Sequence, residues 1–196
     1  MNGLAMLGVG IVAISALAGG LWLWSSRSIE MPDYTVELKD GAFELRRYPA
    51  MVVASIDRAG SRGNAVRAAF SPLAGYIFAR SREGEKIAMT APVTQEPATD
   101  GWKVSFIMPS GRSVVDLPQP TAEIELSNVA PRLAASITFS GSWMDSRFEE
   151  ASDKLLIWVE RQGYLPAGPP EYAYYNDPFT PPFLRRNEVI VELNED

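Results

Sequence analysis

The chain has 196 residues, a formal net charge of −6 and neither cysteine nor histidine. The absence of these two residue types excludes disulfides, serine–histidine and cysteine–histidine catalysis, ordinary zinc sites and the commonest haem-iron ligand. The acidic balance, with no run of basic residues, argues against nucleic acid as the main partner.

The N-terminal segment is apolar. Residues 3–24 carry no charge, and the stretch is long enough to cross the hydrocarbon core of a bilayer. Trp22 and Trp24 lie at its end, as at a membrane interface. A signal peptide cleaved after Ala18 is the alternative, but no Lys or Arg precedes the apolar run. We therefore predict a retained single-pass transmembrane anchor over residues 1–26, on an undetermined side of the membrane, and a polar linker over residues 27–33.

The remaining residues, 34–196, have the length of one domain. Apolar runs bounded by turn residues predict nine strands, near residues 35–39, 43–48, 51–57, 86–93, 102–108, 123–126, 133–139, 171–175 and 188–193. Pro92 has no N–H to donate, so the strand at 86–93 is expected to lie at an edge or to end there.

Two segments have the apolar spacing of amphipathic helices. The first stripe comprises Val66, Ala69, Phe70, Leu73 and Ile77, and the second comprises Phe148, Ala151, Leu155, Trp158 and Val159. Pro72 is expected to kink or split the first helix. Ser142 and Asp145 resemble a capping box for the second helix, and Gly163 resembles its C-terminal cap.

The two helical segments belong to a repeated pattern. The tripeptide Ala-Ser-Ile occurs at residues 54–56 and again at 135–137, which is 81 residues later (135 − 54). Each copy lies in an apolar strand that leads through Gly60 or Gly141 into a helix. Strands grouped around one helix in each half predict an α+β fold that arose by duplication, not an alternating parallel sheet.

Two motifs carry a resemblance to a known family. Residues 86–93 read KIAMTAPV, and residues 185–189 read RRNEV. In this order and at this separation, they resemble the SOUL/haem-binding protein family, over about residues 34–193. The resemblance implies a distorted antiparallel β-barrel with two helices packed outside and a pseudo-two-fold internal repeat. It also implies non-covalent binding of haem or another tetrapyrrole in a hydrophobic groove.

The resemblance places that groove between the first helix and the aromatic and proline-rich loop at residues 172–184. The implied contacts with the ligand are Arg67, Phe70, Leu73, Ala74, Met89, Phe179 and Phe183. Arg67 matches the family's basic residue, whose guanidinium can bind a propionate. Gly75 and Pro181 stand where relatives carry further basic residues. From the residues alone, a surface arginine and a rigid crossover loop are the alternatives.

Iron ligation and the second motif lead to separate expectations. With His and Cys absent, only Met89 and tyrosines remain as ordinary iron ligands, so we expect hydrophobic enclosure without histidine ligation. We interpret the RRNE motif structurally, with Asn187 holding a turn and Glu188 pairing with an arginine.

Two other functions stay open. One is a general hydrophobic-ligand or effector-binding module. The other is a hydrolase that uses Glu171 beside Tyr172 and Trp158, although a carboxylate without a second acid, base or metal makes a weak catalytic site. We therefore expect a membrane-anchored haem-binding or tetrapyrrole-binding protein, not an enzyme.

Overall fold

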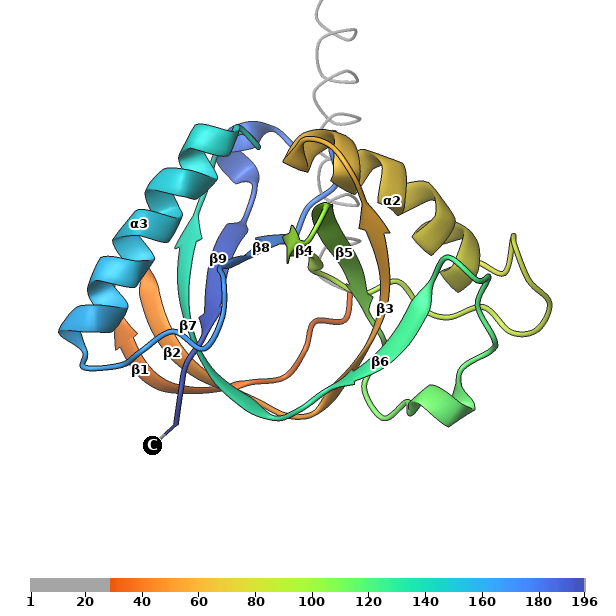
Figure 1. Ribbon diagram of the computed structural model, residues 1–196, viewed down its shortest axis with the longest axis horizontal. Helices are drawn as coiled ribbons and strands as arrows, with labels where there is room; N and C mark the ends of the chain where they lie inside the picture. The colour runs from red at the N-terminus through yellow and green to blue at the C-terminus, as the bar shows by residue number, and fades with distance from the viewer. Residues whose placement is uncertain (1–28, 196) are drawn as a thin grey trace, which may run out of the picture. The chain divides into compact units, whose positions relative to one another are not determined.

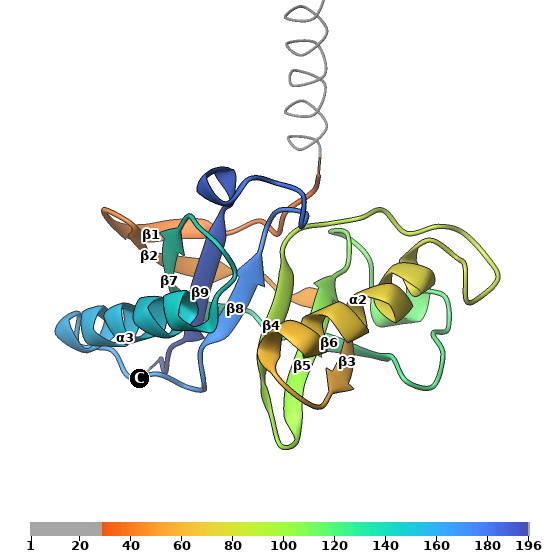
Figure 2. The same ribbon diagram turned by 90° about the horizontal axis from the view of Figure 1, so that it is seen from above.

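Nine antiparallel strands form one curled sheet in the computed structural model, which describes residues 29–195 (Figure 1). The strands are β1 (Thr35–Asp40), β2 (Phe43–Tyr48), β3 (Met51–Arg58), β4 (Val93–Ala98), β5 (Gly101–Ile107), β6 (Glu125–Val129), β7 (Arg132–Phe139), β8 (Glu171–Tyr174) and β9 (Asn187–Glu192). The helices α2 (Arg62–Ile77) and α3 (Asp145–Arg161) pack outside the curl (Figures 1 and 2). The loops contain two short 3-10 helices, η1 (Val114–Asp116) and η2 (Pro182–Leu184). The predicted α+β class is confirmed.

The sheet does not close into a barrel. Its strand order is β1-β2-β7-β9-β8-β4-β5-β3-β6, and every neighbouring pair is antiparallel. Because β1 and β6 stay at opposite edges, the expected distorted barrel takes the form of an open sheet that curls strongly.

The strand order has the two-fold symmetry that the repeat predicts. With β1 set aside, reversing the order exchanges β2 with β6, β7 with β3, β9 with β5 and β8 with β4. The equivalent strands β3 and β7 lead into α2 and α3 through Gly60 and Gly141, which both have positive φ angles. The halves meet at β4 and β8, where Thr94 pairs with Ala173.

Alternation along each strand separates two faces of the sheet. On β3, Val52, Ala54 and Ile56 are buried in the core that the sheet shares with the helices. The residues between them face the inner side of the curl, where they line a pocket. The apolar stripe predicted for α3 is confirmed, because Phe148, Ala151, Leu155, Trp158 and Val159 are all buried.

The strand predicted at residues 86–93 is wrong for most of its length. β4 begins only at Val93, after a stretch without regular pairing, and the Ala91–Pro92 peptide bond is cis. Pro92 has no N–H for the ladder, so regular pairing starts after it. The side chain of Thr90 is buried and donates to the carbonyl of Ile107 at 2.5 Å.

Two predictions about helix ends and breaks also need correction. Pro72 does not split α2, which runs without a break from Arg62 to Ile77. The capping box at Ser142 is absent, since α3 begins at Asp145 after Met144. Trp143 is held outside the helix by Asn187, which accepts its indole N–H at 2.9 Å.

The predicted membrane anchor, residues 1–26, lies outside the described residues. Within residues 29–195, no helix is both long and apolar enough to span a membrane.

Candidate functional site

The residues that the family resemblance places on the first helix differ in accessibility. Arg67 is exposed and forms no hydrogen bond or ion pair with the described part of the chain. Phe70 is 44% exposed and meets the buried ring of Phe106 edge-on, with ring centroids 5.4 Å apart. Leu73 and Ala74 are buried in the core. A ligand on the surface of α2 can therefore reach Arg67 and Phe70 without rearrangement of the core.

Met89 follows α2 in the stretch before β4. It is half-buried and packs against the same core as Leu73. Its side chain is therefore only partly accessible to a ligand.

The late loop projects its two phenylalanines into solvent. Phe179 is 93% exposed and Phe183 is 75% exposed. Asp177 accepts the backbone N–H groups of Phe179 and Thr180 at 2.8 and 3.0 Å. Arg185 donates to two loop carbonyls at 2.8 Å. These bonds hold the loop in an ordered shape although its apolar side chains are exposed.

This loop is fixed to the segment that precedes α3. The N–H of Gly141 donates to the carbonyl of Pro182 at 2.9 Å, and the guanidinium of Arg185 lies 4.4 Å from the ring centroid of Trp143. In both views the dark-blue turn of η2 lies on the α3 side of the domain, with α2 on the other side (Figures 1 and 2). Within residues 29–195, no hydrogen bond or ring contact joins the predicted contacts on α2, Arg67 and Phe70, to those on the loop.

Between the first turns of the helices lies a buried arginine that sequence reasoning missed. Arg62 is only 4% exposed, and its guanidinium lies 4.4 Å from the ring centroid of Phe148. It donates to Asp145 at 2.8 Å, to the carbonyl of Trp143 at 2.8 Å and to the hydroxyl of Tyr174. The guanidinium of Arg62 therefore occupies the space beside these aromatic rings, between the two halves of the domain.

Arg62 left one signal in the sequence. Counting back from Leu73 and Ala69 by helical spacing reaches Ala65 and then Arg62, so all four share the buried face. An arginine in phase with a buried stripe indicates an internal ion pair or an aromatic partner.

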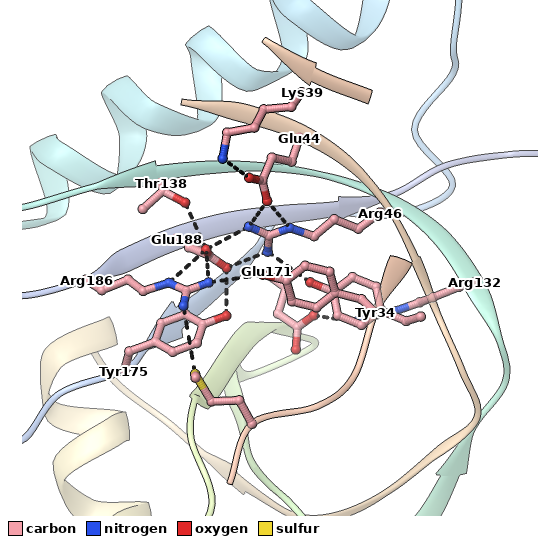
Figure 3. Close-up of polar contacts among 12 residues, drawn as sticks. Tyr34, Lys39, Glu44, Arg46, Arg132, Thr138, Glu171, Tyr175, Arg186 and Glu188 are labelled. Carbon is pink, nitrogen blue, oxygen red and sulfur yellow. Dashed lines mark hydrogen bonds and ion pairs between the residues drawn. The ribbon is translucent and has the colours of Figure 1, made fainter. Parts of the chain in front are cut away.

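The RRNE motif forms a buried ion cluster on the inner face of the sheet (Figure 3). Glu188 is fully buried, and its carboxylate accepts hydrogen bonds from Arg46 at 2.8 and 2.9 Å. Arg186, Thr138 and Tyr175 donate to the same carboxylate at 2.8, 2.9 and 2.7 Å. The structural interpretation of Glu188 is confirmed.

The cluster is satisfied by protein groups. Burial alone would raise the pKa of Glu188, but the hydrogen bonds and charge of Arg46, together with Arg186, outweigh it and lower the pKa to about 2. Burial and the charge of Glu188 raise the pKa of Tyr175, so the phenol stays protonated and can donate. Arg46 also donates to Glu44 at 2.8 Å. Glu188 and Arg46 are thus engaged within the fold and serve its stability.

Beside this cluster, the inner face is hollowed into a pocket of about 240 Å³. Tyr48 and Tyr175 belong both to its wall and to the ion cluster. Arg132 and Glu171 line it as an ion pair with a distance of 2.8 Å (Figure 3). None of the seven contacts implied by the family resemblance lines this pocket.

The geometry separates the residues of the hydrolase hypothesis. Glu171 points to the inner face, where it pairs with Arg132. Tyr172 is its neighbour on β8 and packs against the core that contains Trp158, on the opposite face of the sheet, because successive side chains of a strand alternate. The three residues therefore do not share one site.

Comparison with known proteins agrees with the fold and the motifs. The family model described as "SOUL heme-binding protein" matches residues 29–192. The mouse (Mus musculus) protein "Heme-binding protein 2" is 25% identical over 186 residues, which cover 86% of this chain and 89% of the mouse protein. Two solved structures share the fold. The EcmrR C-terminal domain has a TM-score of 0.60 at 16% identity and covers 83% of this chain and 99% of its own. A hydrolase from Listeria innocua has a TM-score of 0.54 at 12% identity and covers 81% of this chain and 94% of its own. The chain belongs to the SOUL heme-binding protein family.

Proposed function

We propose that the domain binds haem or a related tetrapyrrole on the outer surface of α2, without histidine ligation of the iron. The observation that carries the proposal is the family match over residues 29–192. The name of the mouse relative, Heme-binding protein 2, points to the same class of ligand.

The accessible residues of α2 suit an aromatic acid. Arg67 and Phe70 are three positions apart and therefore lie on the same side of the helix. The unpaired guanidinium of Arg67 can bind a carboxylate through two parallel hydrogen bonds. The half-exposed ring of Phe70 offers an apolar surface to a flat macrocycle.

The candidate iron ligands in the same surroundings are already engaged in the fold. Tyr76 is fully buried and its hydroxyl donates to the carbonyl of Pro118 at 2.8 Å, while Tyr174 is bound to Arg62 and Gln95. Met89 packs against the core. The residues present thus fit the macrocycle and its carboxylate, and we expect binding to depend on these and not on iron.

The test is a titration of the full-length protein with haemin and with iron-free protoporphyrin IX, followed by absorbance and fluorescence. Both ligands should saturate with similar affinity. Arg67→Ala should weaken each by roughly 1–3 kcal/mol, the range for a hydrogen bond to a charged group. Arg67→Lys should recover part of the loss, since a point charge cannot reproduce the planar fork. Arg161→Ala, a change at an exposed arginine of α3, is the matched control.

The dimethyl ester of protoporphyrin IX separates charge recognition from packing. Its affinity should not respond to Arg67→Ala, whereas Phe70→Asp should weaken both the acid and the ester. An equal loss for acid and ester in Arg67→Ala would contradict the carboxylate contact. Equally tight binding of unrelated apolar dyes would replace tetrapyrrole binding with a general hydrophobic-ligand function.

We further propose that residues 3–24 hold this domain at a membrane. The support is the uncharged apolar composition of the segment, whose length matches a bilayer core.

A further inference from the structure

The pocket on the inner face of the sheet contains two charges of opposite sign that attract each other across the ladder but form no ion pair or hydrogen bond. Glu96 of β4 and Lys103 of β5 stand directly opposite each other in the antiparallel register, and both line the pocket. Both are half-buried, and neither forms an ion pair or a hydrogen bond within the described part of the chain. Glu171 differs, because Arg132 already neutralises it at 2.8 Å.

Half-buried charges that lack a direct hydrogen-bonding partner are costly, and a bound ligand of complementary charge would relieve that cost by contacting each of them. Burial, followed by the negative charge of Glu171, raises the pKa of Glu96, and the positive charges of Lys103 and Arg132 offset this only in part. This carboxylate would therefore gain from a nearby ammonium group. Lys103 would gain in the same way from a carboxylate. A ligand with one charge alone would leave the other half-buried group without a direct ionic contact.

We propose that this pocket binds a small zwitterion of the free amino-acid type, with its ammonium group at Glu96 and its carboxylate at Lys103. The volume of about 240 Å³ lies below the usual range for drug-sized ligands. The hydroxyls of Thr94 and Ser105 add hydrogen-bonding capacity, and Val53 and Ile107 provide apolar wall for a hydrocarbon side chain.

The surrounding structure favours a preformed site. The pocket draws β3, β4 and β5 from one half of the repeat and Arg132, Glu171 and Ile190 from the other. Its wall at Tyr48 and Tyr175 is tied by hydrogen bonds to Arg46 and Glu188 of the buried cluster. Little side-chain entropy should therefore be lost on this wall when a ligand binds.

Isothermal titration of the full-length protein with L-leucine tests the proposal. Leucinamide, which lacks the carboxylate, and N-acetyl-leucine, which lacks the ammonium group, should each bind about tenfold or more weakly than leucine. Glu96→Gln should weaken leucine but not N-acetyl-leucine. Lys103→Met should weaken leucine but not leucinamide. Glu149→Gln, on the exposed side of α3, should change neither.

Three outcomes would overturn the proposal: no heat of binding from leucine or any other free amino acid at millimolar concentration, leucinamide as tight as leucine, or N-acetyl-leucine as tight as leucine. The comparison of the three ligands on the unaltered chain decides the question even if a variant fails to fold. Haemin titration of Glu96→Gln should match the wild type, which separates this site from the surface of α2. Weaker haemin binding in that variant would show that the two sites are not independent, and would count against the separate site proposed here.

Discussion

Arg46 and Glu188 are 142 residues apart in the sequence and form a two-pronged ion pair that crosses β7 on the inner face of the sheet. The guanidinium can pass over β7 because Ala134 and Ser136 present only small side chains on that face. The pair joins β2, near the start of the domain, to β9, near its end. Removing either partner would leave the other charge buried without its counter-charge. Such a change costs more stability than replacing both partners with apolar residues.

Acidification should destabilise the domain through Glu188. Its pKa is about 2 in the folded state against an ordinary value of 4.5, so the folded state binds fewer protons than the unfolded state between these values. The resulting stabilisation is fully present above about pH 4.5 and is lost as the pH falls toward 2. At about 1.4 kcal/mol per pKa unit, it is on the order of 3 kcal/mol. Urea unfolding of the full-length protein across this pH range measures it.

Glu188→Gln should reduce this acid dependence and lower stability at neutral pH, since Arg46 then lacks its buried counter-charge. Glu149→Gln, at an exposed site, should preserve both the stability and the slope. A Glu188→Gln variant with an unchanged pH profile would show that other carboxylates dominate the acid transition.

Arg62 should matter for stability, in contrast to Arg67 on the same helix. Arg62→Met keeps much of the side-chain volume but removes the cation from the ring of Phe148 and the hydrogen bonds to Asp145 and to the carbonyl of Trp143. We expect a loss of about 2 kcal/mol in the free energy of unfolding. Arg67→Met should lie within about 0.5 kcal/mol of the wild type, as is usual for exposed positions. Similar losses in the two variants would contradict the buried role of Arg62.

The same substitution should have opposite effects at two glycines. Gly101 opens β5 with φ at +128°, and an added Cβ would come within 2.8 Å of the Cα of Ala59. Gly101→Ala should therefore destabilise by more than about 1 kcal/mol. Gly63, in the first turn of α2, has open space around it, so Gly63→Ala should stabilise by about 0.4–1 kcal/mol through the unfolded state. Thermal melting of both variants decides the signs.

The N-terminal segment should keep the native protein in the membrane fraction. Residues 3–24 are uncharged and apolar, so extraction should require detergent, and a variant lacking residues 1–28 should move to the soluble fraction. Intact-mass analysis of the native protein is the direct check. A mature chain that starts near Gly19 and fractionates as soluble would refute the anchor.

Local patterns in the sequence determined much of the secondary structure. The stripe from Phe148 to Val159 predicted the buried face of α3 because helical periodicity depends only on residues within a few turns. Gly60 and Gly141 marked the turns before both helices, where φ is positive. The repeated Ala-Ser-Ile segments indicated the duplication that the strand order displays. The absence of histidine and cysteine excluded whole classes of chemistry without reference to the fold.

Contacts between distant segments were decided only by the tertiary structure. The motif suggested that Glu188 pairs with an arginine, but the choice of Arg46 depends on β2 and β9 both flanking β7. Phe70 fits the helical stripe, yet its side chain is 44% exposed. The fully buried residues of α2 include Ala65, Ala69 and Leu73, which lie on the face of the helix that packs on the sheet. The pairing of β4 with β5 sets Glu96 opposite Lys103, and the curl of the sheet encloses them in a pocket. Strand order and curvature arise from the packing of the whole chain, so no short stretch of sequence encodes them alone.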